Sequence, residues 1–298
     1  MSSPVQTQRA LHLRGGEHAV LLFHGLSSSP QELQFLARGM NRAGYSVHVP
    51  VMAGYTYNGP DQALGRHDHW ARAALAEFDK LQGQYSSVAV GGLCIGAVLA
   101  LRVAALRAPQ VSAVLALSTT LHYDGWATPW TRRLLPLAAW VPWAQRIGVR
   151  EAEPFGVKDE RMRAWIGGQM REAGNSDAGA AILRVGDLLQ ARRLIRQVRH
   201  RLGDISSPVL AIHAKEDDAA SPRSAWEVAN RVASGKIRVV MLSDSYHMIS
   251  IDREKHQVLR EMCQFLQDTV DAHAKEQARP SLGKLFSLDA LTTLRKIP

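Results

Sequence analysis

The hydrophobic residues of this chain form short, nearly continuous runs that end at Gly, Pro or charged residues. Runs of four to eight apolar residues between turn signals are typical of strands buried on both faces. The first run, His18–Phe23, ends at His24 and Gly25. Six such runs are predicted strands, namely residues 18–23, 45–50, 87–92, 111–117, 209–213 and 237–242.

Between these runs, apolar residues recur at helical spacing. Helices are predicted from Pro30 to Gly44, over 68–82, from the end of the third run to about Arg107, and over 253–271. Strands that alternate with helices are typical of a mostly parallel sheet with helices on both faces. The sequence therefore predicts an α/β fold.

Residues 121–205 interrupt this alternation. The segment contains five of the seven tryptophans and is rich in arginine. Its composition favours helices, and we expect a helical cap inserted between two strands of the core. The predicted division is a core of residues 1–120 and 206–273, the cap, and a C-terminal tail of residues 274–298.

Composition limits the class of protein. The chain has 298 residues, of which 46% are hydrophobic and 21% charged, as in soluble globular proteins. No apolar run approaches the roughly 20 residues of a membrane span, and the N-terminus has no signal-peptide pattern. Two cysteines provide neither a disulfide framework nor a zinc site. These features predict a cytoplasmic protein.

The net charge of +9 lies mainly in the cap, which has 14 basic and 9 acidic residues, and in the tail. A solvated basic surface accounts for this excess, and attraction of an acidic partner or substrate is the alternative. No nucleic-acid-binding motif accompanies the charge, so nucleic acid is not expected as a partner.

A candidate nucleophile follows the third predicted strand. Gly92-Leu93-Cys94-Ile95-Gly96 fits the pattern G-x-S-x-G with cysteine in place of serine, between a strand and a helix. The nucleophile of such an elbow occupies a strained turn, so the residues two positions away must be small. The positive end of the helix favours a thiolate and a developing oxyanion. The second cysteine, Cys263, is expected to pack in the core.

Two backbone N–H groups are candidates for an oxyanion hole. In this architecture one donor follows the nucleophile and the other follows the first buried strand. These positions are Ile95 and Leu26. We expect His24 to orient this loop and not to act as the base.

The acid and the base are expected after the nucleophile in chain order. Asp217 lies just beyond the fifth predicted strand and is the predicted acid, and Asp218 is the second choice for this role. His247 lies in the loop after the last strand and is the predicted base. His213 is expected to be structural. The twelve histidines include no metal-binding motif, so neither a metal nor a cofactor is predicted.

The chain resembles the monoacylglycerol lipase and carboxylesterase branch of the α/β-hydrolases, above all the small bacterial carboxylesterases. The resemblance covers about residues 20–120 and 206–270. It implies a metal-free and cofactor-free esterase, with Leu26 and Ile95 as the oxyanion hole, Asp217 as the acid and His247 as the base. The family nucleophile is serine where this chain has Cys94, and residues 121–205 have no clear match. The matching stretches are LLFHGLSSSPQELQFLARGMNRAGYSVHVP, VAVGGLCIGAVLAL, SPVLAIHAKEDDAASPRSA and LSDSYHMISIDREKHQVLREMCQFL.

Three functions are compatible with these residues. The first is hydrolysis of a small-molecule ester or thioester with a medium-sized apolar acyl group through an acyl-cysteine intermediate, with the tryptophan-rich cap lining the acyl pocket. The second is acyl transfer from a thioester of coenzyme A or of an acidic acyl-carrier protein. The third is a hydrolase fold that binds a ligand without catalysis.

Overall fold

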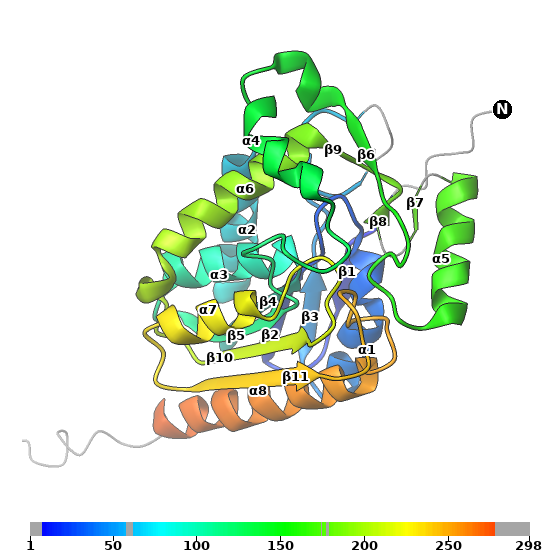
Figure 1. Cartoon of the computed structure of the whole chain (residues 1–298). Coiled ribbons are helices and arrows are strands. Elements are labelled where there is room, and N and C mark those ends of the chain that lie inside the picture. Colours follow the sequence, from blue (N-terminus) through cyan, green and yellow to red (C-terminus); the bar gives the residue numbers. More distant parts are fainter. Residues whose placement is uncertain (1–7, 58–61, 174, 177–178, 278–298) are drawn as a thin grey trace, which may run out of the picture.

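Seven strands form a single sheet in the order β1-β3-β2-β4-β5-β10-β11 in the computed structural model, which describes residues 8–57, 62–173, 175–176 and 179–277 (Figure 1). All neighbouring strands are parallel except β1 and β3, which are antiparallel. All six predicted strands are present, and the mostly parallel α/β fold is confirmed. The strands are β1 (Leu11–Leu13), β2 (His18–Phe23), β3 (Ser46–Val49), β4 (Ser87–Leu93), β5 (Val111–Leu117), β10 (Val209–Ala214) and β11 (Ile237–Leu242).

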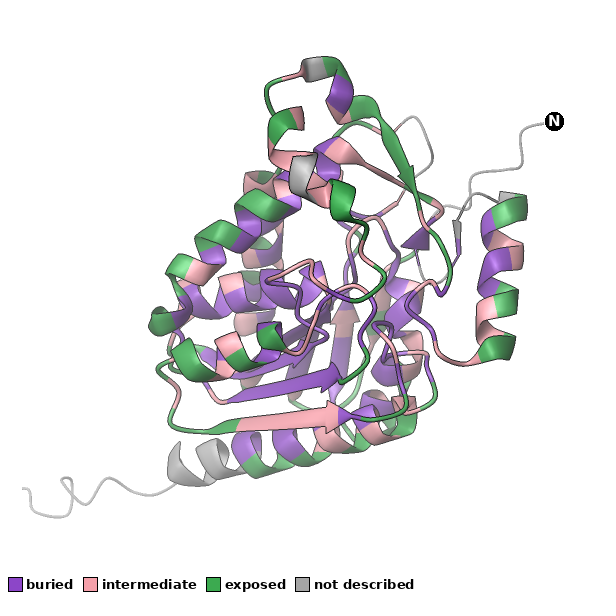
Figure 2. Cartoon of the chain, viewed as in Figure 1, coloured by how far each residue is buried: buried purple, intermediate pink, exposed green. Residues whose placement is uncertain are grey.

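Helices cover both faces of the sheet. Side chains of a strand alternate between its faces, so Leu21 and Phe23 enter one hydrophobic cluster while Val20 and Leu22 enter the other. The residues of both clusters are buried, so the central strands need apolar side chains on both of their faces (Figure 2). One face carries α2 (His67–Gln82), α3 (Ile95–Arg107), α6 (Val185–His200) and α7 (Arg223–Arg231), and the other carries α1 (Gln34–Arg42) and α8 (Lys255–Gln277).

The segment between β5 and β10 contains the predicted cap. Two small antiparallel strand pairs, β6 with β9 and β7 with β8, are present in addition to the expected helices. Helix α6 packs against α2 and α3 on the core, although it lies within the predicted cap range. The other elements are η2 (Trp130–Leu134), α4 (Leu135–Ala138), η3 (Pro142–Arg146), β6 (Gly148–Arg150), α5 (Glu160–Ala173), β7 (Asn175–Ser176), β8 (Gly179–Ala180), β9 (Ile182–Arg184) and η4 (Leu202–Asp204).

Three local features differ from the predicted pattern. Strand β1 was not predicted, because three residues at a sheet edge give too short a period-two signal. The helix predicted after Pro30 begins with a separate 3-10 turn, η1 (Pro30–Leu33). Helix α8 continues past its predicted end at Asp271 to Gln277. The rest of the predicted tail, residues 278–298, lies outside the described residues.

Candidate active site

Cys94 occupies a strained turn between β4 and α3. Its φ of 58° and ψ of −118° lie outside the regions that non-glycine residues ordinarily adopt. A Cβ atom on Gly92 would come within 2.5 Å of backbone atoms of Gly96 and Phe23, and one on Gly96 would come within 2.1 Å of the Phe23 carbonyl oxygen. Glycine is therefore required on both sides of Cys94, as the elbow pattern predicts.

The Cys94 thiol is partly exposed at the N-terminus of α3. Its Sγ atom lies 3.3 Å from the hydroxyl oxygen of Thr120, just beyond β5. The Thr120 hydroxyl in turn donates to the Ser118 carbonyl at 3.3 Å, so the thiol is the donor to Thr120 in this arrangement. Strands β4 and β5 are neighbours, which explains why residues 26 positions apart meet here.

Asp217 and His247 form a buried pair. The Nδ1 atom of His247 lies 2.8 Å and 3.0 Å from the two carboxylate oxygens of Asp217. A carboxylate accepts only, so Nδ1 carries a proton and Nε2 is the nitrogen that gains or loses the titrating proton. Nε2 has no hydrogen-bond partner among the described residues. Burial lowers the pKa of His247, but the Asp217 carboxylate and the Cys94 sulfur outweigh it and raise that pKa well above its usual value.

Besides His247, three groups lie against the Asp217 carboxylate: two backbone N–H donors and the side chain of His213. The N–H groups of Ala219 and Ala220 donate to Asp217 at 2.9 Å and 2.7 Å. His213 Nε2 lies 3.2 Å from Asp217 and 2.7 Å from the Ala220 carbonyl oxygen. Burial raises the pKa of Asp217, yet His247 and His213 together hold it well below its usual range. His213, expected to be structural, therefore shares the carboxylate with the predicted base.

Asp218, the second choice for the acid, bonds to the backbone of His247. One carboxylate oxygen accepts from the His247 N–H at 3.2 Å, and the other accepts from the Gly156 N–H at 3.1 Å. Burial raises the pKa of Asp218, and the neighbouring Asp217 adds to this effect. Asp218 thus joins the loop of the predicted base to the segment that follows β6.

The loop with Leu26 is held by a buried carboxylate that no sequence signal indicated. Glu32 accepts hydrogen bonds from the Gly25 N–H and the Ser28 hydroxyl. Within the described residues, the Leu26 N–H has no backbone or side-chain acceptor assigned to it. The Ile95 N–H is at the first position of α3, where no intrahelical acceptor exists. Neither N–H group at the two predicted oxyanion positions thus has an acceptor in the part of the chain that the structure describes.

His24 supports the same loop. Its Nδ1 donates to the Gly25 carbonyl at 2.7 Å, so Nε2 accepts from the Thr56 hydroxyl at 2.8 Å. Tyr55 donates its hydroxyl to the His24 carbonyl at 2.7 Å. Burial lowers the pKa of His24 to about 4, which keeps the imidazole neutral. These contacts suit the expected orienting role.

Glu151 and Tyr123 extend the site into the segment after β5. Burial and the nearby Asp218 raise the pKa of Glu151, His247 opposes the shift, and the resulting pKa is about 7. Burial raises the pKa of Tyr123, as do the nearby Cys94 and Glu151. Both groups therefore lie within electrostatic reach of the candidate catalytic residues. Neither has a spacing that could have revealed it in the sequence.

A cavity of about 500 Å³ lies elsewhere, between α5 and the loop before α8. Its lining includes Arg161, Trp165 and Arg253 but none of the predicted catalytic residues. Over the described residues, no helix is both long and apolar enough to cross a membrane.

Comparison with known families gives one match over most of the chain. The model of the Hydrolase_4 family, described as serine aminopeptidase S33, matches residues 16–254. The matched range includes the elbow, Asp217 and His247.

Two characterised proteins and a solved structure are similar along nearly their whole length. A carboxylesterase of Bacillus subtilis (strain 168) is 22% identical over 264 residues, which cover 88% of this chain and 98% of that protein. A thermostable monoacylglycerol lipase of Bacillus sp. (strain H-257) is 21% identical, with 85% and 92% covered. A structure from a study of two metagenome-derived lipolytic enzymes, LipS and LipT, aligns with a TM-score of 0.75 at 21% identity, covering 90% of this chain and all of the other.

Proposed function

Because the chain belongs to the Hydrolase_4 family, described as serine aminopeptidase S33, we propose that it hydrolyses carboxylic esters through a covalent acyl-cysteine intermediate. The observation that carries this proposal is the Asp217–His247 pair: Asp217 holds Nδ1 of His247, and the sulfur of the strained Cys94 lies near enough to His247 to raise its pKa. Cys94 is the nucleophile, His247 the general base and acid, and Asp217 the carboxylate that orients His247.

The reaction proceeds in two halves. His247 Nε2 takes the thiol proton, and the Cys94 sulfur attacks the ester carbonyl. The N–H groups of Leu26 and Ile95 stabilise the oxyanion, at about 3–4 kcal/mol for a well-placed donor. His247 then protonates the departing alcohol, which leaves a thioester between the acyl group and Cys94. Finally His247 deprotonates a water that attacks this thioester, releasing the acid and returning the proton to Cys94.

The surroundings of Cys94 favour an apolar acyl group. Leu26 and Tyr123, like Cys94, are partly buried and pack against one core cluster, and Tyr123 lies within electrostatic reach of Cys94. Phe155 and Cys94 both pack against the other cluster. Apolar walls with a few polar groups are typical of pockets for small molecules. The relatives named as a carboxylesterase and a monoacylglycerol lipase are consistent with a substrate of this kind.

The test is steady-state turnover of p-nitrophenyl esters of increasing acyl length and of matching acyl thioesters. Cys94→Ala should abolish hydrolysis. Cys263→Ala is the matched control, because that thiol lies on α8 away from the elbow, and it should keep wild-type kcat/KM. Full activity in Cys94→Ala would refute the nucleophile. An absence of turnover with every donor would leave a hydrolase fold that only binds its ligand.

Acyl transfer is the second candidate, and the cysteine itself favours it. Exchange between a thioester donor and an acyl-cysteine retains the same type of bond, so it is close to thermoneutral. Adding an amine, thiol or alcohol to the same assay separates the two functions. A transferase would give acylated acceptor in preference to free acid, whereas a hydrolase would give free acid at all acceptor concentrations.

A further inference from the structure

The segment after β5 exposes an unusual number of tryptophans. We call residues 126–150, which contain η2, α4, η3 and β6, the cap tip (Figure 1). Single exposed apolar residues are normal, whereas several large ones on one short segment indicate an interaction surface. The exposed fractions are 60% for Trp126, 72% for Trp130, 63% for Leu137, 87% for Trp140 and 71% for Trp143.

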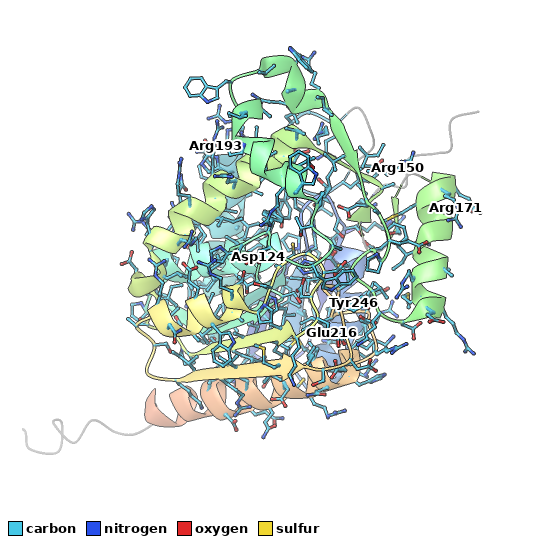
Figure 3. All side chains as sticks on the ribbon, viewed as in Figure 1. Asp124, Arg150, Arg171, Arg193, Glu216 and Tyr246 are labelled. Atoms are coloured by element: carbon cyan, nitrogen blue, oxygen red, sulfur yellow. The ribbon has the colours of Figure 1, made fainter. Side chains whose placement is uncertain are left out.

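The charged residues of the cap tip are all basic. From Gly125 to Arg150 the sequence has four arginines and no aspartate or glutamate. Helix α6 packs against α4 and η3, and it adds the exposed Arg192, Arg193 and Arg196. Figure 3 shows Arg193 on one side of the tip and Arg150 on the other. The exposed indoles and these guanidinium groups thus belong to one segment and to the helix that packs against it.

Trp126 joins the base of the tip to both loops of the candidate active site. Its indole N–H donates to the Glu216 carbonyl at 2.9 Å, directly before Asp217. Its ring meets that of Tyr246, directly before His247, edge-on at a centroid distance of 5.4 Å. Glu216 and Tyr246 lie close together in Figure 3, below the tip. A ligand that contacts Trp126 at the base of the tip would therefore lie next to these two loops.

We propose that the cap tip docks the protein onto an anionic lipid surface. Tryptophan prefers the boundary between lipid headgroups and acyl chains, and arginine beside it pairs with anionic headgroups. The tip helices have four or five residues each, so they suit shallow insertion and not a span. A second copy of the basic tip, or the C-terminal residues 278–298 with four basic and one acidic residue, would bring like charge to it. A lipid surface of opposite charge is therefore the complementary occupant.

The test is flotation of the full chain with phosphatidylcholine vesicles that contain or lack phosphatidylglycerol. We expect binding to the anionic vesicles, weakening with added salt, and a blue shift of tryptophan fluorescence. Trp140→Ala combined with Trp143→Ala should reduce the partition coefficient at least about tenfold, because two indoles lose their place in the interface. Trp226→Ala is the matched control, since Trp226 is 49% exposed on α7, and it should bind like the wild type.

Docking is independent of catalysis, so Cys94→Ala should bind these vesicles as well as the wild type. The proposal is overturned if the wild type does not bind anionic vesicles, or if the double variant binds them equally well. It is also overturned if the tip binds a purified acidic acyl-carrier protein while the vesicles stay unbound.

Discussion

Replacing Asp217 by Asn tests how the carboxylate controls His247. The Asn carbonyl oxygen can still accept from the N–H groups of Ala219 and Ala220, which lie 2.9 Å and 2.7 Å from Asp217 Oδ1. The amide nitrogen then replaces Oδ2, which lies 2.8 Å from His247 Nδ1. Because two donors would face each other there, His247 must move its proton to Nε2 and lose its basic nitrogen.

The expected loss follows from this change of tautomer. An imidazole protonated at Nε2 cannot take the Cys94 proton, and the comparable change in serine hydrolases lowers kcat by about 10⁴. For a cysteine nucleophile we expect kcat to fall about 10³–10⁴-fold, which corresponds to about 4–5.5 kcal/mol. KM should change little, because Asp217 is buried behind His247 and does not face the substrate.

The assay is turnover of the best ester at several pH values, with circular dichroism to verify the fold. Asp244→Asn is the matched control, since this carboxylate is exposed and pairs with Arg253 and Lys158 at the surface. It should keep kcat within about twofold of the wild type, as surface substitutions usually have small effects. A folded Asp217→Asn variant that keeps kcat within tenfold of the wild type would refute the reasoning.

Three further substitutions probe other buried or paired carboxylates. Glu32→Ala leaves the Gly25 N–H unpaired and releases the oxyanion loop, so single-turnover acylation should slow by about 10–100-fold while substrate binding changes little. Glu151→Gln should remove an inflection near pH 7 from the pH profile of kcat/KM, because burial raises the pKa of Glu151 to about 7. Burial raises the pKa of Glu227, but Arg199, His122 and Arg231 outweigh burial and lower that pKa from 4.5 to about 2. The contribution of Glu227 to the stability of the fold is therefore complete above pH 4.5 and is lost as the pH falls towards 2. Urea unfolding should show Glu227→Gln less stable by about 1 kcal/mol at neutral pH, after solvent screening, and equal to the wild type near pH 2.

The main strands and the elbow were predictable because each has a local signal. The strand from His18 to Phe23 is apolar on both faces, and such a run needs no knowledge of its neighbours. The two glycines that flank Cys94 form a pattern that is recognisable within five residues, although the atoms that a Cβ would meet there include the backbone of Phe23. Asp217 and His247 each follow a parallel strand, and the carboxyl ends of such strands meet at one edge of the sheet.

The residues that support the site had no local signal. Glu32 lies in a 3-10 turn seven residues after Gly25, and its burial depends on how that turn folds back over the loop. His213 points to Asp217 only because the chain turns sharply between them. The two strand pairs of the cap have two or three residues per strand, too few for a period to be recognised.

The most direct test of the central claim is the intact mass of the protein after mixing with an activated acyl ester or acyl thioester, followed by peptide mapping. The account predicts one acyl group on Cys94 of the wild type, loss of the adduct in Cys94→Ala, and a longer-lived adduct in His247→Ala that has been acylated by a reactive donor. An adduct confined to Cys263 or to a serine, or turnover by Cys94→Ala, would contradict it.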